Sequence, residues 1–167
     1  DIQLSLSSNL DLVKKLKATE LDAIIVALNE TTSGQEFEHL PMFEDDIFLA
    51  VNKDSKYVGC DEIDLSQLKD ETFLTLKKGF ATRNDSDFVF EKAGINPKVF
   101  LQVSDIFTLI SMVSSGVGLA LLPGRISTIY ESSVKLIRLK AQYQIKQQIG
   151  LVFLKSKERD PNLLAFI

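Results

Sequence analysis

The residues best suited to chemistry form one basic segment, residues 77–83 (Lys-Lys-Gly-Phe-Ala-Thr-Arg). The segment follows the apolar run 72–76, which has the composition of a buried strand. Open α/β sheets bind their ligands at the carboxyl ends of strands, so this position is a candidate binding loop. Its three cations favour an anion, and predicted helix starts near Asn9 and Ser104 would add amide donors and positive dipoles. We expect a small carboxylate-bearing ligand, although a basic loop is also typical of a plain solvated surface.

Residues that could carry catalysis are sparse. His39 is the single histidine, which excludes a metal site with two His ligands. Cys60, the single cysteine, has no basic neighbour in sequence to activate its thiol. Residues 66–69 fit the S-x-x-K pattern without its companion motifs, and the acidic triplet 44–46 is typical of a solvated strand edge. We therefore expect no catalytic residue, no metal, no cofactor and no enzymatic activity.

The composition is that of an ordinary globular chain. Its 167 residues are 45% hydrophobic and 25% charged, which suits one domain or two small lobes and excludes a disordered chain. Nineteen basic residues against 23 acidic ones give a net charge of −4, so any contact with DNA is expected outside this chain. The longest apolar stretches have six residues, whereas a membrane helix needs about 20, and no membrane association is expected. A lone cysteine fits a reducing cytosol.

The hydrophobic pattern alternates between strand and helix periods. Residues 2–6 alternate as a half-buried strand, Asn9 can cap a helix ending near residue 17, and residues 21–28 suit a strand covered on both faces. Together they predict a βαβ unit with a parallel sheet. Further strands are expected at residues 40–43, 46–51, 72–76, 99–103, 119–122, 134–139 and 149–154. Further helices are expected around residues 65–68, after a cap at Asp85 or Ser86, after a cap at Ser104 or Asp105, over 126–131, and from Asp160 onward.

The order of several motifs resembles the effector-binding domain of LysR-type transcriptional regulators. The most specific motif is residues 113–123, Val-Ser-Ser-Gly-Val-Gly-Leu-Ala-Leu-Leu-Pro, which is similar to that family's VaaGlGialLP segment. Other segments fit the same order: residues 20–25, 48–51, 65–68, 73–76 and 93–97. The resemblance covers essentially the whole chain.

This resemblance implies a fold and a division of the chain. The implied fold is α/β, with two Rossmann-like lobes joined by two crossover strands, periplasmic-binding-protein-like of type 2. Residues 1–52 with 138–167 would form lobe I, and residues 53–137 lobe II. The chain has no initiator Met, and it lacks the strand and helix that the family places before Asp1. We expect it to be a piece of a longer protein that carries the DNA-binding domain elsewhere.

The resemblance also implies a ligand site built from turns at the ends of strands. Carried over position by position, its residues are Ser8, Asn9, Ala27, Leu28, Lys77, Lys78, Gly79, Thr82, Ser104 and Phe107. Asp105 lies in the last of these turns and would repel an anion unless it is used as a helix cap. Some relatives have an arginine at the position of Ala27, so no carboxylate clamp is expected there.

The function that these features predict is sensing of a small molecule by a bacterial LysR-type regulator. The protein is expected to be cytoplasmic and to bind DNA only through its separate N-terminal domain. The resemblance further implies a homo-oligomer formed through residues 99–115, with Phe107 and Met112 exposed. The alternative is a solute-binding protein of a transport system with the same two-lobed fold. An enzyme on this fold needs an acid, base or nucleophile set that the sequence does not offer.

Overall fold

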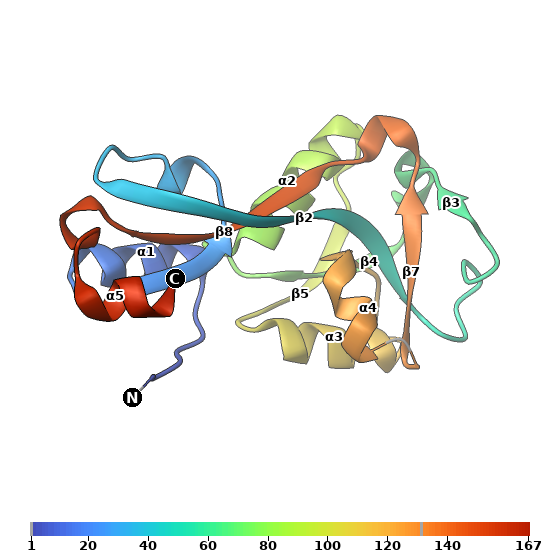
Figure 1. The fold of residues 1–167 in the computed structure, drawn as a ribbon. Helices are drawn as coiled ribbons and strands as arrows, with labels where there is room; N and C mark the ends of the chain where they lie inside the picture. The colour runs from blue at the N-terminus through green and yellow to red at the C-terminus, as the bar shows by residue number, and fades with distance from the viewer. Residues whose placement is uncertain (1, 131) are drawn as a thin grey trace. The chain divides into compact units, whose positions relative to one another are not determined.

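The chain forms two compact units in the computed structural model, which describes residues 2–130 and 132–167. One unit contains the residues up to Glu44 together with Gln147–Ile167, and the other is Asp45–Lys146. Two long strands, β2 (Phe37–Asn52) and β8 (Lys146–Leu154), contain the points where the chain passes between units (Figure 1). The boundaries expected from the sequence, 52/53 and 137/138, fall inside the second unit.

The first unit packs helices on a small antiparallel sheet. Strand β1 (Ala23–Ala27) pairs with β8, and β8 pairs with β2. Helix α1 (Asn9–Lys17) buries Val13 and Leu16 in a core that also contains Ile24, Val26, Phe37 and Val152. Helix α5 (Pro161–Phe166) starts at the predicted cap Asp160 and buries Leu163. Two short 3-10 turns, η1 (Glu30–Thr32) and η5 (Lys155–Lys157), complete this unit.

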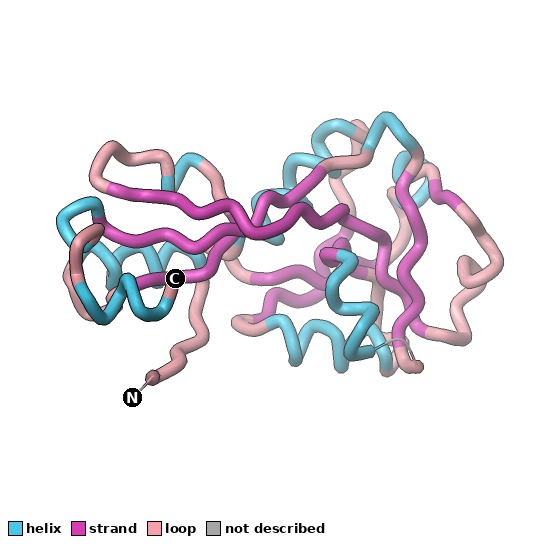
Figure 2. Tube along the Cα trace, viewed as in Figure 1, coloured by secondary structure: helices cyan, strands magenta, loops and turns pink. Residues whose placement is uncertain are grey.

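Two sequence predictions for the first unit are wrong. Residues 2–6 form no strand but an exposed loop, in pink ahead of α1 in Figure 2. A strand requires a hydrogen-bonded neighbour, and none of the described pairings includes this segment. The expected parallel βαβ unit is therefore absent. Strand β1 lies at the sheet edge, and its Ile25 side chain is 53% exposed instead of being covered.

The second unit contains two strand systems. In the first, β2 pairs antiparallel with both β6 (Ala120–Pro123) and β7 (Val134–Leu139), and β3 (Glu62–Ile63) pairs parallel with β7. In the second, β4 (Thr72–Leu76) and β5 (Lys98–Val103) form a parallel pair. The remaining elements are η2 (Leu65–Leu68), α2 (Ala81–Lys92), α3 (Ile106–Ser114), η3 (Gly124–Ile126), α4 (Ser127–Tyr130) and η4 (Ala141–Tyr143).

Most of the predicted elements of the second unit are confirmed. Strands β4 to β7 lie within a residue of their predicted ranges, whereas residues 40–43 and 46–51 belong to the single strand β2. The short helix predicted over 126–131 is formed by η3 and α4, and Glu131 lies outside the described residues. No helix among the residues described is both long and apolar enough to cross a membrane.

Strand β4 contributes to two separate cores. Successive side chains of a strand point to opposite faces, so Phe73 enters one core and Leu74 the other. In the first core the Phe73 ring packs edge-on against Phe90 of α2, with ring centroids 4.9 Å apart. In the second, Leu74 belongs to the same apolar cluster as Leu109 of α3. Burial on both faces fixes β4, and with it the loop that follows.

Two glycines let the segment 113–123, which carries the most specific motif of the sequence, approach β4. Gly116, with φ +75°, ends α3 in the left-handed region that favours glycine. A Cβ at Gly118 would lie 2.9 Å from the Thr72 carbonyl oxygen, so a side chain there would collide with backbone. Because the approach is this close, the Leu119 N–H donates to Thr72 O at 2.9 Å and the Leu74 N–H donates to Leu119 O at 2.8 Å. The segment therefore has a structural role in holding β4.

Truncating Phe90 should test this packing, with Phe88 as its matched control on the same helix. Phe90 is 6% exposed and Phe88 is 54% exposed. Phe90→Ala should lower the free energy of unfolding by about 3–5 kcal/mol, because it leaves a cavity beside Phe73. Phe88→Ala should change it by less than about 0.5 kcal/mol. Urea denaturation followed by circular dichroism measures both, and equal losses would contradict the packing described here.

Candidate ligand-binding site

The ends of β4 and β5 bring two of the predicted segments together. The strands run parallel, with Leu76 opposite Val103 at their carboxyl ends. The Lys77 N–H donates to the Val103 carbonyl oxygen at 2.9 Å, so the basic loop starts beside the turn into α3. Lys77 and Lys78 therefore share one sheet edge with Ser104, which follows β5 directly.

The loop after β4 presents uncompensated positive charge. Lys77 and Lys78 are both exposed, and neither takes part in an ion pair with any residue that the structure describes. Gly79 has φ +101°, a conformation that side chains with a Cβ rarely adopt. The glycine thus turns the chain sharply after the two lysines and leads it into α2.

Helix α2 starts earlier than the sequence predicts. It begins at Ala81, with Phe80 as an extended N-cap that provides no side-chain hydrogen bond, rather than after a cap at Asp85 or Ser86. Thr82 is consequently buried in the first turn instead of lying in a loop. The Ser86 hydroxyl, far from capping, donates to the Thr82 carbonyl oxygen at 2.7 Å. The helix therefore starts without the side-chain acceptor that preferred N-cap residues supply.

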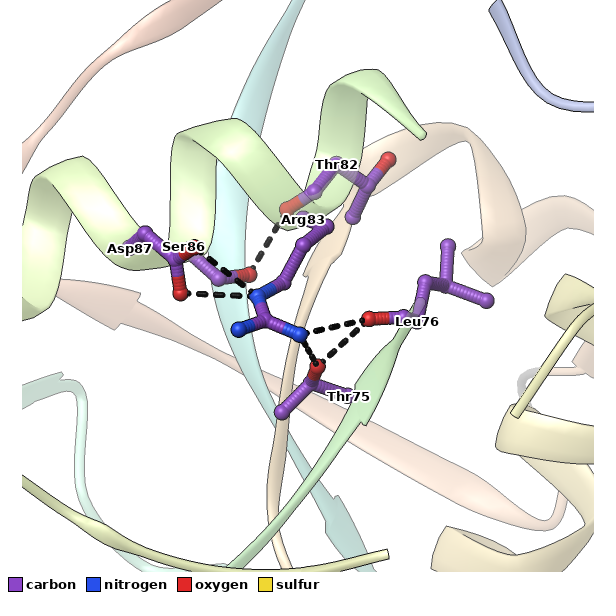
Figure 3. Close-up of polar contacts among 6 residues, drawn as sticks. All are labelled: Thr75, Leu76, Thr82, Arg83, Ser86 and Asp87. Atoms are coloured by element: carbon purple, nitrogen blue, oxygen red, sulfur yellow. Dashed lines mark hydrogen bonds and ion pairs between the residues drawn. The ribbon is translucent and has the colours of Figure 1, made fainter. Parts of the chain in front are cut away.

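Arg83 is not a free cation of this loop, which corrects the sequence prediction. Its Nε donates to both carboxylate oxygens of Asp87, at 2.8 and 2.9 Å. Its Nη1 donates to Thr75 Oγ1 at 3.2 Å and to Leu76 O at 3.1 Å (Figure 3). The guanidinium thus ties α2 to the last residues of β4, and the positive charge available to a ligand comes from Lys77 and Lys78.

Asp105 caps α3, as one of the two sequence alternatives proposes. Its carboxylate accepts from the Thr108 hydroxyl at 2.6 Å and from the Thr108 N–H at 2.8 Å. These hydrogen bonds, the hydroxyl's first, hold the pKa of Asp105 below its ordinary value. The carboxylate is therefore engaged by its own helix. Nearby, Ser104 is exposed and the Phe107 side chain is 50% exposed.

The first unit brings the other predicted residues together. Ser8, not Asn9, is the N-cap of α1, and its hydroxyl oxygen accepts from the Asp11 N–H at 3.2 Å. Asn9 instead donates from Nδ2 to the Ala27 carbonyl oxygen at 2.9 Å, which joins the start of α1 to the end of β1. Leu28 follows and donates its N–H to Gln148 O at 2.7 Å. These four residues form one cluster in this unit.

Sequence reasoning missed the buried polar residues behind the second-unit loop. Thr75 and Ser86 are almost fully buried, and their hydroxyls contribute to the hydrogen bonds that surround Arg83. A threonine within an apolar strand carries no sequence signal of such a role. The charge of Arg83 is visible in the sequence. The predicted start of α2 is too late, however, so the prediction assigns Arg83 to the loop instead of to the helix.

Other chemistry-bearing residues have local structural partners. His39 Nε2 bonds the Thr32 carbonyl oxygen, and Asp45 of the acidic triplet accepts from the Arg125 N–H and side chain, both at 3.0 Å. Cys60 is a half-buried free thiol. Across the described ranges 2–130 and 132–167, no group of three or more His, Cys, Asp or Glu residues could hold a metal ion.

Comparisons with known proteins identify the class of this two-unit α/β fold. The regulatory domain of CcmR from Synechocystis, solved with 2-PG, superposes with a TM-score of 0.88 at 17% identity over 99% of this chain and 79% of its own. The effector-binding domain of QuiR, solved with shikimate, superposes with a TM-score of 0.82 at 23% identity over 95% and 74%. The fold is that of effector-binding domains, of the periplasmic-binding-protein-like type 2 predicted from the sequence.

The chain belongs to the LysR substrate binding domain family, whose model matches residues 1–167. It is 40% identical over 166 residues to the "Malonate utilization transcriptional regulator" of Klebsiella pneumoniae. The aligned region covers 99% of this chain and 54% of that protein. The chain thus spans about half the length of the curated relatives that it matches. The resemblance stated from the sequence is confirmed.

The capping role of Asp105 can be tested by its pH dependence. A carboxyl whose pKa falls on folding stabilises the protein above its ordinary pKa of about 3.9, and this contribution is lost as the pH drops through the folded value. Asp105→Asn retains a cap acceptor but does not titrate. The melting temperature of the unaltered protein should therefore fall relative to that of Asp105→Asn below about pH 4. Parallel pH dependences in thermal melts would contradict the assignment.

Proposed function

We propose that this chain is the effector-sensing part of a LysR-type transcriptional regulator and that its effector is a small dicarboxylate. The proposed ligand residues are the two clusters described above, Ser8, Asn9, Ala27 and Leu28 in one unit and Lys77, Lys78, Gly79, Thr82, Ser104 and Phe107 in the other. The observation that carries the proposal is the hydrogen bond from the Lys77 N–H to Val103 O, which joins the basic loop to the turn into α3.

The charge distribution at this edge supports an anionic effector. Lys77 and Lys78 are exposed cations, and α2, a helix of 12 residues, begins next to them without a side-chain cap. Backbone N–H groups and the dipole at a helix N-terminus both favour negative charge. The Asp105 carboxylate accepts its hydrogen bonds from Thr108 at the N-terminus of its own helix, where the helix dipole compensates part of its charge.

Malonate is the natural first probe. The relative that is 40% identical across nearly the whole chain has a name that refers to malonate utilization. Malonate carries two carboxylates on one carbon, and Lys77 and Lys78 are adjacent cations that suit a ligand of two negative charges.

In this proposal the chain catalyses nothing. Binding of the effector changes the conformation of the regulator, and a part of the whole protein other than this chain contacts the DNA. The regulator works in the cytoplasm, where its operator DNA is found. The net charge of −4 fits a chain that does not itself neutralise DNA phosphates.

A thermal-shift and calorimetric titration with malonate tests the proposal. A ligand that binds only the folded state stabilises it by RT ln(1 + [L]/Kd), about 2.7 kcal/mol at 100 times Kd. Lys78→Ala and Ser104→Ala should each weaken binding by about tenfold, the loss expected for one charged or well-placed hydrogen bond. Isothermal titration calorimetry measures the affinities.

Lys92→Ala is the matched control for charge. Lys92 is an exposed lysine at the C-terminal end of α2, whereas Lys78 lies just before its N-terminal end. Removing Lys92 therefore changes the net charge by the same amount as removing Lys78 without altering the loop. It should leave the affinity unchanged. Preference for neutral or cationic metabolites over dicarboxylates, or equal effects of Lys78→Ala and Lys92→Ala, would contradict the proposal.

We also propose that the chain associates through residues 99–115. Val99, Leu101 and Phe107 leave more than a third of their surface exposed, which is a common property of interface residues. Met112 is not exposed as predicted, since it packs against the core cluster of α3. A change at Met112 would therefore test folding rather than association.

Phe107→Asp should shift a dimer to a monomer, because it places a charge in the apolar contact. Phe88→Asp is the control, an equally exposed phenylalanine on α2. Light scattering coupled to size-exclusion chromatography measures the mass of each variant. A monomeric unaltered chain, or a dimer that survives Phe107→Asp, would show that this surface is not the interface.

A further inference from the structure

Arg83 is an almost buried cation on the first turn of α2. Its side chain is 11% exposed, although charged side chains are seldom buried unless they are paired. The pair is Asp87 one turn along the same helix, and Asp87 itself is half exposed. A surface i,i+4 ion pair of this kind requires no burial of the arginine. The burial of Arg83 therefore follows from its other contacts, which reach back to β4.

Those contacts lie on both sides of the basic loop. Arg83 follows the loop, and its Nη1 donates to Thr75 Oγ1 and Leu76 O, which precede it (Figure 3). The Thr75 hydroxyl in turn donates to Leu76 O at 2.7 Å. The guanidinium thus holds the two ends of the segment 77–80 close together, while Asp87 holds the guanidinium.

The geometry requires an arginine. A guanidinium is a planar fork that can donate in two directions at once, here to a carboxylate through Nε and to β4 through Nη1. A lysine ammonium has the same charge but places its donors on one atom. It cannot span Asp87 and Leu76 in this way.

Apart from Phe80, which packs against the core cluster that contains Leu74 and Leu109, the rest of the loop has few other restraints. Phe80 provides no side-chain cap, and Gly79 is the most permissive residue type. The loop is tied to β5 by the Lys77 N–H to Val103 O bond, and to α2 by the Arg83 and Asn84 N–H groups, which donate to Phe80 O at 3.1 and 3.3 Å. Without Arg83, Leu76 O and Thr75 Oγ1 would lose the donor that connects them to α2.

We infer that Arg83 is a positioning residue for effector binding, an inference that rests on the proposed function. It does not contribute its charge to the ligand. It fixes the conformation of residues 77–80, so that Lys78 and the start of α2 are already arranged for a carboxylate before the effector arrives. Preorganisation of this kind raises affinity because the ligand does not have to order the loop.

Arg83→Lys tests the inference because it keeps the charge and removes the fork. The matched control is Arg125→Lys, which alters the ion pair with Asp45 elsewhere in the same unit. In the ligand-free chain, amide hydrogen exchange of peptides covering residues 77–84 should be about tenfold faster in Arg83→Lys than in the unaltered chain. Exchange in residues 134–139 should not change, and Arg125→Lys should leave residues 77–84 unchanged.

Malonate is the probe for the second measurement. Calorimetry should give about tenfold weaker binding to Arg83→Lys and unchanged binding to Arg125→Lys, with circular dichroism confirming that both variants are folded. Unchanged exchange at 77–84, or faster exchange with unchanged malonate affinity, would overturn the inference while leaving the proposed function intact. Faster exchange in a chain whose unaltered form binds no dicarboxylate would overturn both the proposed effector class and the effector role of Arg83.

Discussion

Parallel pairing of β4 with β5 is the constraint on which the candidate site depends. Parallel strands have their carboxyl ends at one edge, so the segments that follow Leu76 and Val103 must start side by side. An antiparallel pair would place them at opposite edges. The pairing is in turn held by burial of β4 on both faces, with Phe73 in one core and Leu74 in the other, and by the close approach of Leu119 that Gly118 permits. The position of the candidate ligand residues therefore depends on the packing of β4.

At this same edge, two charged side chains besides the lysines are already bound by other residues of the protein. Asp105 and Arg83 have opposite charges and both are engaged, the first by Thr108 of its own helix and the second by Asp87 and β4. The cations at this edge that form no ion pair with a described residue are Lys77 and Lys78. A hollow elsewhere in the second unit is lined by Asn52, Asp54, Ser55 and residues 70–72 and 116–119. Its charged lining residues are the carboxylates Asp54, Asp70 and Glu71, which do not favour an anion. The electrostatics of this unit therefore favour the loop over the hollow as an anion site.

Local patterns in the sequence were sufficient for elements whose packing is also local. The period of Leu109, Ile110 and Val113 predicts α3, and Asp160 before Pro161 predicts the start of α5. Prediction failed where the outcome depends on distant partners. Residues 2–6 have strand periodicity but no described strand to pair with. Helix α2 starts at an uncapped Phe80, and Arg83 of its first turn hydrogen-bonds to β4, a distant contact that no local pattern reports. The order of motifs identified the family, whereas no local pattern reports a tertiary hydrogen bond such as that of Asn9 to Ala27.

The central claim is that the effector's carboxylates bind where β4 and β5 end. An amide chemical-shift titration of the isotopically labelled chain with malonate tests it most directly, because each backbone N–H reports its own surroundings. The account predicts that the largest saturable shifts in the second unit occur at residues 77–82 and 104–107. Saturable shifts centred instead on residues 52–55 and 116–119, or shifts spread evenly over exposed lysines without saturation, would contradict it.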